Sequence, residues 1–141
     1  MNRLYLYCIW LMLAFATTAC GQRNTPATVA HDVNTDGEVL YLQHCAECHG
    51  EQGEGQPNWK QPNNVGVYPA PPHDSTGHTW HHPDDLLVQI IVEGGSMPMS
   101  NMPPFGDQLS KTEIQAILAH IQTFWGAEER AFQEQVSRQG R

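Results

Sequence analysis

Basic residues are scarce in this sequence of 141 residues, with seven Lys and Arg against fifteen Asp and Glu and a net charge of -8. A protein that binds nucleic acid needs a basic face to neutralise phosphates, so we expect no nucleic-acid partner. Charged residues make up only 16% of the chain and hydrophobic ones 40%. That is enough apolar material for one small domain, and the length is too short for two ordinary ones.

A long hydrophobic run is also missing. The uncharged stretch of residues 4–19 is shorter than the ~20 residues that a membrane-spanning helix needs. Arg3 precedes this stretch and small residues follow it, which is typical of a secretory signal. We therefore expect an exported chain in which residues 1–19 are the signal.

Cys20 directly follows the small residues 17–19. This arrangement resembles a bacterial lipoprotein signal, in which such a Cys is lipidated and becomes the mature N-terminus. An ordinary A-x-A cleavage site at residues 14–16 stays open as the alternative. Residues 20–35 are polar and lack apolar periodicity, which suits a linker. The resemblance implies a protein in the periplasm or at the cell surface, tethered to the membrane by acyl chains.

Cysteine is scarce, and the four present would ordinarily form two disulfides in an exported chain. One of them leaves with the signal and Cys20 lies at its end, so Cys45 and Cys48 remain. They stand in the C-x-x-C-H sequence that attaches a c-type haem. Thiols at this spacing on a helical turn add to the two vinyl groups of one haem, and the imidazole of His49 then reaches the iron.

Two other kinds of C-x-x-C site compete with haem attachment. A thioredoxin-like dithiol needs the motif at the end of a strand, but the preceding residues 37–44 have a helical pattern. A four-ligand zinc site needs a second close pair of Cys or His, which only the later histidines could supply. Covalent haem is therefore the better-supported prediction.

Two motifs at opposite ends of one domain resemble those of small bacterial monohaem cytochromes c of the class I type. Residues 36–50 resemble the family's N-terminal helix and haem motif, and residues 102–110 resemble its distal-ligand loop and the start of its last helix. The resemblance implies an all-α, class I cytochrome c-like fold, with three or more helices packed around one covalent haem. We expect the cytochrome c domain at residues 36–126 and a helical extension or tail at residues 127–141.

Three methionines are candidates for the distal iron ligand. A thioether is a soft, neutral ligand that raises the potential of His-ligated iron. Met102 precedes Pro103 and Pro104, which stiffen the loop, and it stands in the Met-Pro-x-Phe context of the resembled family. We predict Met102 as the ligand, with Met97 as the alternative because it also precedes a Pro. Met99 is expected to be a pocket or surface side chain.

The loop of residues 51–82 carries most of the remaining polar chemistry. The resemblance implies a Pro carbonyl that accepts the ring N–H of His49 and fixes its orientation, and of the two adjacent prolines we favour Pro71. His73 stands where the family more often has an apolar residue. Trp80 is expected either to close over the haem edge and bond a propionate, or to be an ordinary core residue.

Caps and helical periodicity predict helices at residues 36–47, 83–92 and 110–125, the last of which opens with a capping box. As in the resembled family, the third helix should cross the first, with His120 against Tyr41. The side chains expected to be buried include Val39, Leu40, Tyr41, Ile114, Ile117, Leu118, Ile121 and Trp125.

A copper-handling or metal-sensing module that also carries haem is a second hypothesis, because copper sites use imidazole and thioether clusters. Its candidate ligands lie in residues 73–82 and 97–102, and they are His73, His78, His81, His82, Met97, Met99 and Met102. A peroxide-reducing enzyme is a third hypothesis. It needs an open distal position and usually a second haem, whereas the sequence offers one C-x-x-C-H and a good Met donor.

We therefore predict an electron carrier rather than an enzyme. It is expected to be monomeric and to shuttle single electrons between membrane-associated redox partners, such as an oxidase, a reductase or a dehydrogenase. Without Arg3, six basic residues oppose fifteen acidic ones, a charge near -9. Docking should therefore use a basic patch on the partner or an apolar ring around the haem edge.

Overall fold

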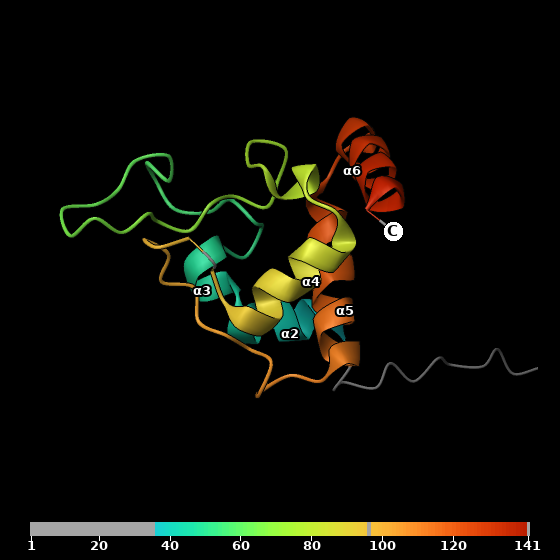
Figure 1. The fold of residues 1–141 in the computed structure, drawn as a ribbon, viewed down its shortest axis with the longest axis horizontal. Helices are drawn as coiled ribbons and strands as arrows, with labels where there is room; N and C mark the ends of the chain where they lie inside the picture. The colour runs from blue at the N-terminus through green and yellow to red at the C-terminus, as the bar shows by residue number, and fades with distance from the viewer. Residues whose placement is uncertain (1–35, 96, 141) are drawn as a thin grey trace, which may run out of the picture. The chain divides into compact units, whose positions relative to one another are not determined.

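The computed structural model describes residues 36–95 and 97–140, so the predicted signal, Cys20 and the linker lie outside the described residues. The described chain is helical and contains no strand (Figure 1), which confirms the prediction of an all-α fold. Its elements are α2 (Gly37–His44), α3 (Ala46–His49), η2 (Thr79–His81), α4 (Asp84–Glu93), α5 (Lys111–Ile121), η3 (Gln122–Phe124) and α6 (Ala127–Gln139).

Helices α2 and α5 cross in contact with each other, as predicted. The Asp36 carboxylate caps α2 by accepting from the Glu38 backbone N–H at 3.0 Å. Ser110 and Glu113 form the predicted capping box at the start of α5. The buried core around the crossing consists of Leu40, Tyr41, Leu87, Ile91, Phe105, Leu109, Ile114, Ile117, Leu118, Ile121 and Trp125.

The first helix is shorter than predicted and is broken at Cys45. The sequence predicts one helix over residues 36–47, but α2 ends at His44 and α3 begins at Ala46. Cys45 keeps its helical hydrogen bond to Tyr41 O, at 2.8 Å, while its φ of -119° turns the chain. The periodicity of apolar side chains cannot predict such a local change of backbone direction. Val39, which was expected in the core, is only partly buried.

Gly37 makes the crossing of α2 and α5 possible. A Cβ on Gly37 would lie 2.1 Å from Ala116 O, which is α5 backbone and cannot move without moving the helix. We expect Gly37→Ala to force the helices apart and to lower the free energy of unfolding by about 1–3 kcal/mol. Denaturant titration measures this loss. Gly140→Ala is the matched control, because its Cβ would meet atoms only at 3.5 Å or beyond, and equal stability of the two variants would contradict the prediction.

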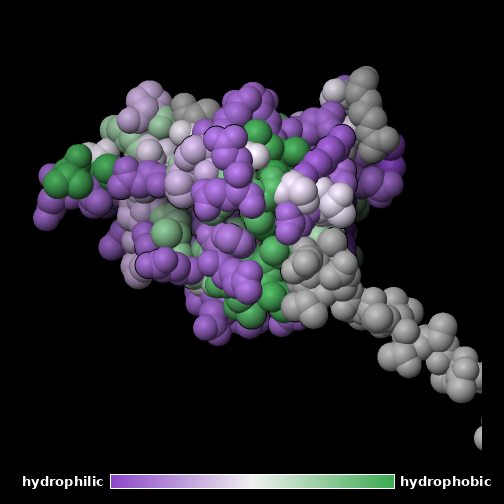
Figure 2. All heavy atoms as spheres, turned by 90° about the horizontal axis from the view of Figure 1, so that it is seen from below, coloured by the Kyte–Doolittle hydropathy of each residue, from purple (hydrophilic) through white to green (hydrophobic). Residues whose placement is uncertain are grey.

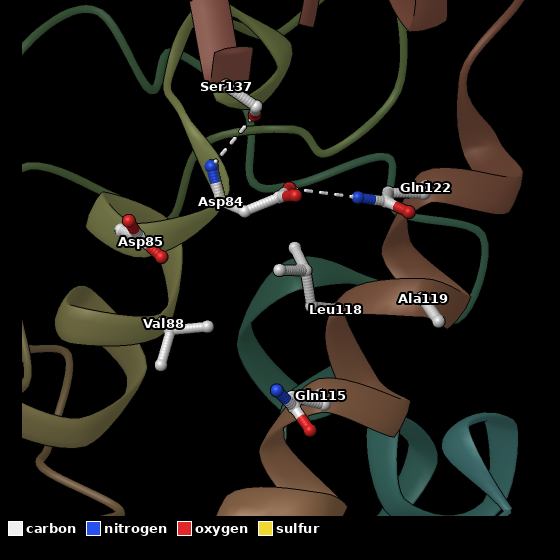
Figure 3. Close-up of a pocket in the computed structure, with 8 residues that line it drawn as sticks. All are labelled: Asp84, Asp85, Val88, Gln115, Leu118, Ala119, Gln122 and Ser137. Carbon is white, nitrogen blue, oxygen red and sulfur yellow. Dashed lines mark hydrogen bonds between the residues drawn. The ribbon is translucent and has the colours of Figure 1, made fainter. Parts of the chain in front are cut away.

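A polar network attaches α6 to the ends of α4 and α5 (Figure 3). The Asp84 carboxylate accepts from Gln122 Nε2 at 3.1 Å, as Figure 3 shows. It also accepts from Gln133 Nε2 at 2.6 Å. The Asp84 backbone N–H donates to Ser137 Oγ at 3.0 Å. Gln133 and Ser137 are buried despite being polar, which is stable because their groups are hydrogen-bonded. The residues after position 126, for which the sequence left a helix or a tail open, form a docked helix as far as residue 139.

Candidate functional site

The C-x-x-C-H segment lies on and next to α3. Tyr41, fully buried in α2, donates from its hydroxyl to Gly50 O at 2.8 Å and so ties α2 to the end of α3. His49 is buried, at 7% exposure, whereas Cys45 is half-buried and Cys48 is exposed. Both thiols are free rather than joined in a disulfide. The segment therefore turns an imidazole inward and keeps two thiols available near the surface.

The ring of His49 is held by a backbone carbonyl. His49 Nδ1 lies 2.9 Å from Pro71 O, and Pro71 is the residue that the sequence favours for this contact. A carbonyl oxygen can only accept, so Nδ1 carries the proton and Nε2 keeps its lone pair. Burial lowers the pKa of His49, and the hydrogen bond to Pro71 O only partly opposes this. The ring is therefore neutral near pH 7, which is the form that binds a metal.

Gly55 allows the segment that carries Pro71 to approach α3. Its φ is +68°, and a Cβ there would lie 2.5 Å from Pro72 N. The Gly55 backbone N–H donates to His49 O at 2.7 Å. The close approach leaves no space for a side chain at position 55. The backbone of residues 50–55, which we call the glycine loop, therefore packs directly against the backbone of Pro71 and Pro72. This arrangement keeps Pro71 O beside the imidazole.

A second imidazole, His73, lies against the first. The ring centroids of His49 and His73 are 4.1 Å apart and the ring planes differ by 17°, which is a stacked arrangement. His73 Nδ1 lies 2.9 Å from Thr79 Oγ1. Burial, together with the neighbouring His49 and His78, lowers the pKa of His73 well below its usual value. Sequence reasoning did not predict this contact, and the only signal was a polar residue at a position that is usually apolar in the resembled family.

The methionine loop folds back onto the end of α4. The Gly95 backbone N–H donates to Met102 O at 3.1 Å. Gly94, with φ +85°, lies so close that a Cβ would be 2.8 Å from the same oxygen. Met102 is partly buried and packs against the core. Met97 and Met99 are 60% and 43% exposed, so of the three only Met102 has its side chain against the core.

Two buried side-chain nitrogens in the described part of the chain have no hydrogen-bond partner, and they are His78 Nδ1 and Trp80 Nε1. The Trp80 ring also packs edge-on against Phe132 of α6, with ring centroids 5.6 Å apart. An unsatisfied buried polar group costs ~1–3 kcal/mol. A propionate of a bound haem is an acceptor that would satisfy the indole N–H.

The histidines of the copper hypothesis make ring contacts with several different neighbours. His73 stacks on the imidazole of the haem motif, and His81 lies edge-on against Trp80 with centroids 3.8 Å apart. The ring centroids of His78 and His82 lie 5.4 Å apart. Within the described residues, no group of three or more His, Cys, Asp or Glu side chains could hold a metal ion. The histidines of the copper hypothesis therefore form no such group within the described residues.

Comparison with known proteins decides the family. The family described as cytochrome C oxidase, cbb3-type, subunit III, matches residues 32–121. The chain belongs to this family of c-type cytochromes. The cytochrome is also 29% identical over 94 residues to the cbb3-type cytochrome c oxidase subunit FixP of Azorhizobium caulinodans. That match covers 65% of this chain and 27% of the relative, and no solved structure matches the cytochrome.

Membership confirms the predicted class I cytochrome c-like fold and the predicted cofactor, a covalently bound haem c. The cytochrome's single C-x-x-C-H segment corresponds to one haem. Its chemistry is haem-based electron transfer. Among the described residues, no helix is long and apolar enough to cross a bilayer.

The residues of the site fit this cofactor. A half-buried thiol precedes α3 and an exposed one lies on it, beside a neutral imidazole whose Nε2 lone pair is available. Burial, together with the nearby Cys48, raises the pKa of the Cys45 thiol to about 11, so the group that would form a thioether is a neutral thiol. The buried N–H of Trp80 has no acceptor within the described residues, and a haem propionate would supply one. Two thiols and an imidazole are the groups that attach and ligate a c-type haem, and the indole N–H could donate to one of its carboxylates.

Proposed function

We propose that this cytochrome is exported and carries single electrons between membrane-associated redox partners, with a terminal oxidase as the acceptor. The observation that carries the proposal is the neutral, buried His49 ring, held at Nδ1 by Pro71 O beside two free thiols. The name of the relative, an oxidase subunit, supports the choice of acceptor.

Each site residue has a part in the proposal. Cys45 and Cys48 hold the haem by thioether bonds, and His49 is the proximal iron ligand. Met102 is the distal ligand, with Met97 as the alternative. When bound, haem supplies the one-electron Fe(III)/Fe(II) couple. The protein would exclude water from the haem and would hold its iron through side chains of its own, so that no substrate would need to bind the iron.

Two further residues, Pro71 and Trp80, would contact the proximal ligand or the haem without binding the iron. Pro71 accepts the N–H of the proximal imidazole, which orients the ring and increases its basicity. Trp80, whose buried Nε1 has no partner within the described residues, would donate to a haem propionate. In this proposal both residues belong to the haem pocket rather than to the general core.

The surface chemistry supports docking to a partner with a basic patch. Acidic residues outnumber basic ones by fifteen to seven, and hydrophilic side chains cover much of the face in Figure 2. Hydrophobic side chains are also visible on this face, in a central band and at its left side (Figure 2), and a loop of residues 57–70 projects to the left in Figure 1. In the same loop Val65 is 80% exposed, and apolar side chains of a surface become the buried core of an interface when a partner docks.

We also propose that Cys20 is lipidated and that residues 20–35 tether the domain to the membrane. This supports the choice of a membrane-bound acceptor, because a tethered carrier searches a surface instead of a volume. The proposal rests on the small residues before Cys20 and on the polar composition of the linker. The mass of the mature N-terminal peptide tests it directly.

An oxygen-uptake assay tests the function. The reduced holo-cytochrome should speed oxygen consumption by membranes that contain a terminal oxidase, and the apo-protein should not. The added rate should fall about tenfold or more between low and high salt, because steering between opposite charges is screened. No acceleration of oxygen uptake would contradict the choice of acceptor, and a rate insensitive to salt would contradict docking through charge.

A further inference from the structure

The stacked pair of imidazoles is the part of the site that haem attachment does not account for. We propose that His73 is a positioning residue, which holds the plane of the His49 ring and lowers the redox potential of the iron that His49 binds. The proposal rests on the proposed role of His49 as the proximal ligand. It adds a residue that neither attaches the haem nor binds its iron. That residue affects the orientation of the His49 ring and the redox potential of the iron through its contact with His49.

His73 is itself held by contacts with four other residues. Its backbone N–H donates to Gly53 O at 2.7 Å, and its carbonyl accepts from Trp125 Nε1 at 2.8 Å. Its ring Nδ1 lies 2.9 Å from Thr79 Oγ1, and Thr79 is buried at 7% exposure. The edge of the Tyr41 ring lies against the same imidazole, with centroids 6.1 Å apart. A side chain restrained in this way cannot turn its face away from His49.

The His49 ring has less to hold it. The hydrogen bond from Nδ1 to Pro71 O restrains one atom of the ring. A parallel ring at 4.1 Å restrains the whole plane, because any rotation of His49 would drive its edge into His73. The orientation of an axial imidazole plane decides how its orbitals overlap with those of the metal. The stacked pair therefore fixes the orientation of the His49 ring plane, which the hydrogen bond alone does not.

The face of the second ring also acts electrostatically. His73 turns the face of its ring toward the His49 ring, at a centroid distance of 4.1 Å. The π face of a neutral aromatic ring attracts positive charge. The His49 ring carries more positive charge when the iron it binds is ferric than when the iron is ferrous. A neutral ring stacked on the ligand therefore favours the ferric state. An aliphatic side chain of similar size would fill the space without this attraction.

Four variants of the holo-cytochrome test the proposal, with the midpoint potential and the electron paramagnetic resonance g values of the ferric form as readouts. His73→Leu keeps the volume but removes the ring, and it should raise the potential and change the spread of g values. His73→Phe keeps a ring face and should stay closer to the wild type in both readouts. Thr79→Val frees the His73 ring and should shift both in the same direction as His73→Leu, by less. Thr76→Val is the matched control, because its hydroxyl bonds Asp74 in an exposed part of the same loop, and it should change neither.

The outcomes separate this proposal from the proposed function. If His73→Leu and Thr79→Val both keep the wild-type potential and g values, His73 only fills space and its positioning role is overturned. If His73→Leu fails to fold, Thr79→Val and His73→Phe decide by the same two readouts. If the wild type lacks the low-spin signal of a His-ligated haem, the role of His49 fails, and the role of His73 fails with it.

Discussion

Replacing both Cys45 and Cys48 with Ala should leave the haem extractable from the protein by acidified acetone, whereas the wild type keeps it. The thioether bonds are the only covalent links that this chemistry provides, and the remaining contacts are ligand bonds that acid breaks. The free state of both thiols and the exposure of Cys48 support the prediction. Absorbance of the extract and haem staining of a denaturing gel both measure the loss.

Single substitutions sharpen this first test. Cys45→Ala and Cys48→Ala should each keep one thioether, so the haem should stay attached and its absorption should shift toward that of a haem with one free vinyl group. Cys20→Ala is the matched cysteine control and should not alter attachment. If the double variant keeps its haem through extraction, the assignment of the C-x-x-C-H segment is wrong.

Met102→Ala should open the iron. Without the thioether, the ferric protein should lose the weak near-infrared band of an S–Fe bond, and carbon monoxide or cyanide should bind readily at the vacated position. The midpoint potential should fall by on the order of 100 mV or more, because axial ligands move haem potentials over a range of about 0.8 V. Near-infrared absorption, ligand titration and a redox titration measure the three effects.

Two other methionines of the same loop provide the controls. Met97→Ala and Met99→Ala should leave the band, the potential and ligand binding nearly unchanged, because these side chains are 60% and 43% exposed. If Met97→Ala opens the iron and Met102→Ala does not, the ligand lies upstream in the loop. A wild-type spectrum without the band would point to two axial histidines, with His78, His81 or His82 as the second ligand.

The sequence was most informative where short-range chemistry decides the structure. The capping box at Ser110 could be predicted because its two hydrogen bonds join residues three apart. The crossing of α2 by α5, with the His120 ring 5.1 Å from Tyr41, followed from the resemblance to a family rather than from periodicity. The haem motif is local by nature, since its spacing is what the cofactor recognises.

Features that depend on distant contacts could not be predicted in the same way. The stacking of His73 on His49 requires the glycine loop to bring the two segments together. The docking of α6 depends on Asp84 meeting Gln133, a pair 49 positions apart in the chain. Neither pair leaves a periodic pattern in the sequence, because each is made by one particular approach of the backbone.

The crossing at Gly37 also bears on the order of events during maturation. The two helices that meet there come from opposite ends of the domain, and a long loop-rich stretch separates them. Joining segments this far apart costs chain entropy before their contacts can stabilise the core. The turn that carries the thiols is local and has no such cost. The thiols can therefore be presented to an attachment enzyme without the α2–α5 contact, and that contact can close on a chain that already holds its cofactor.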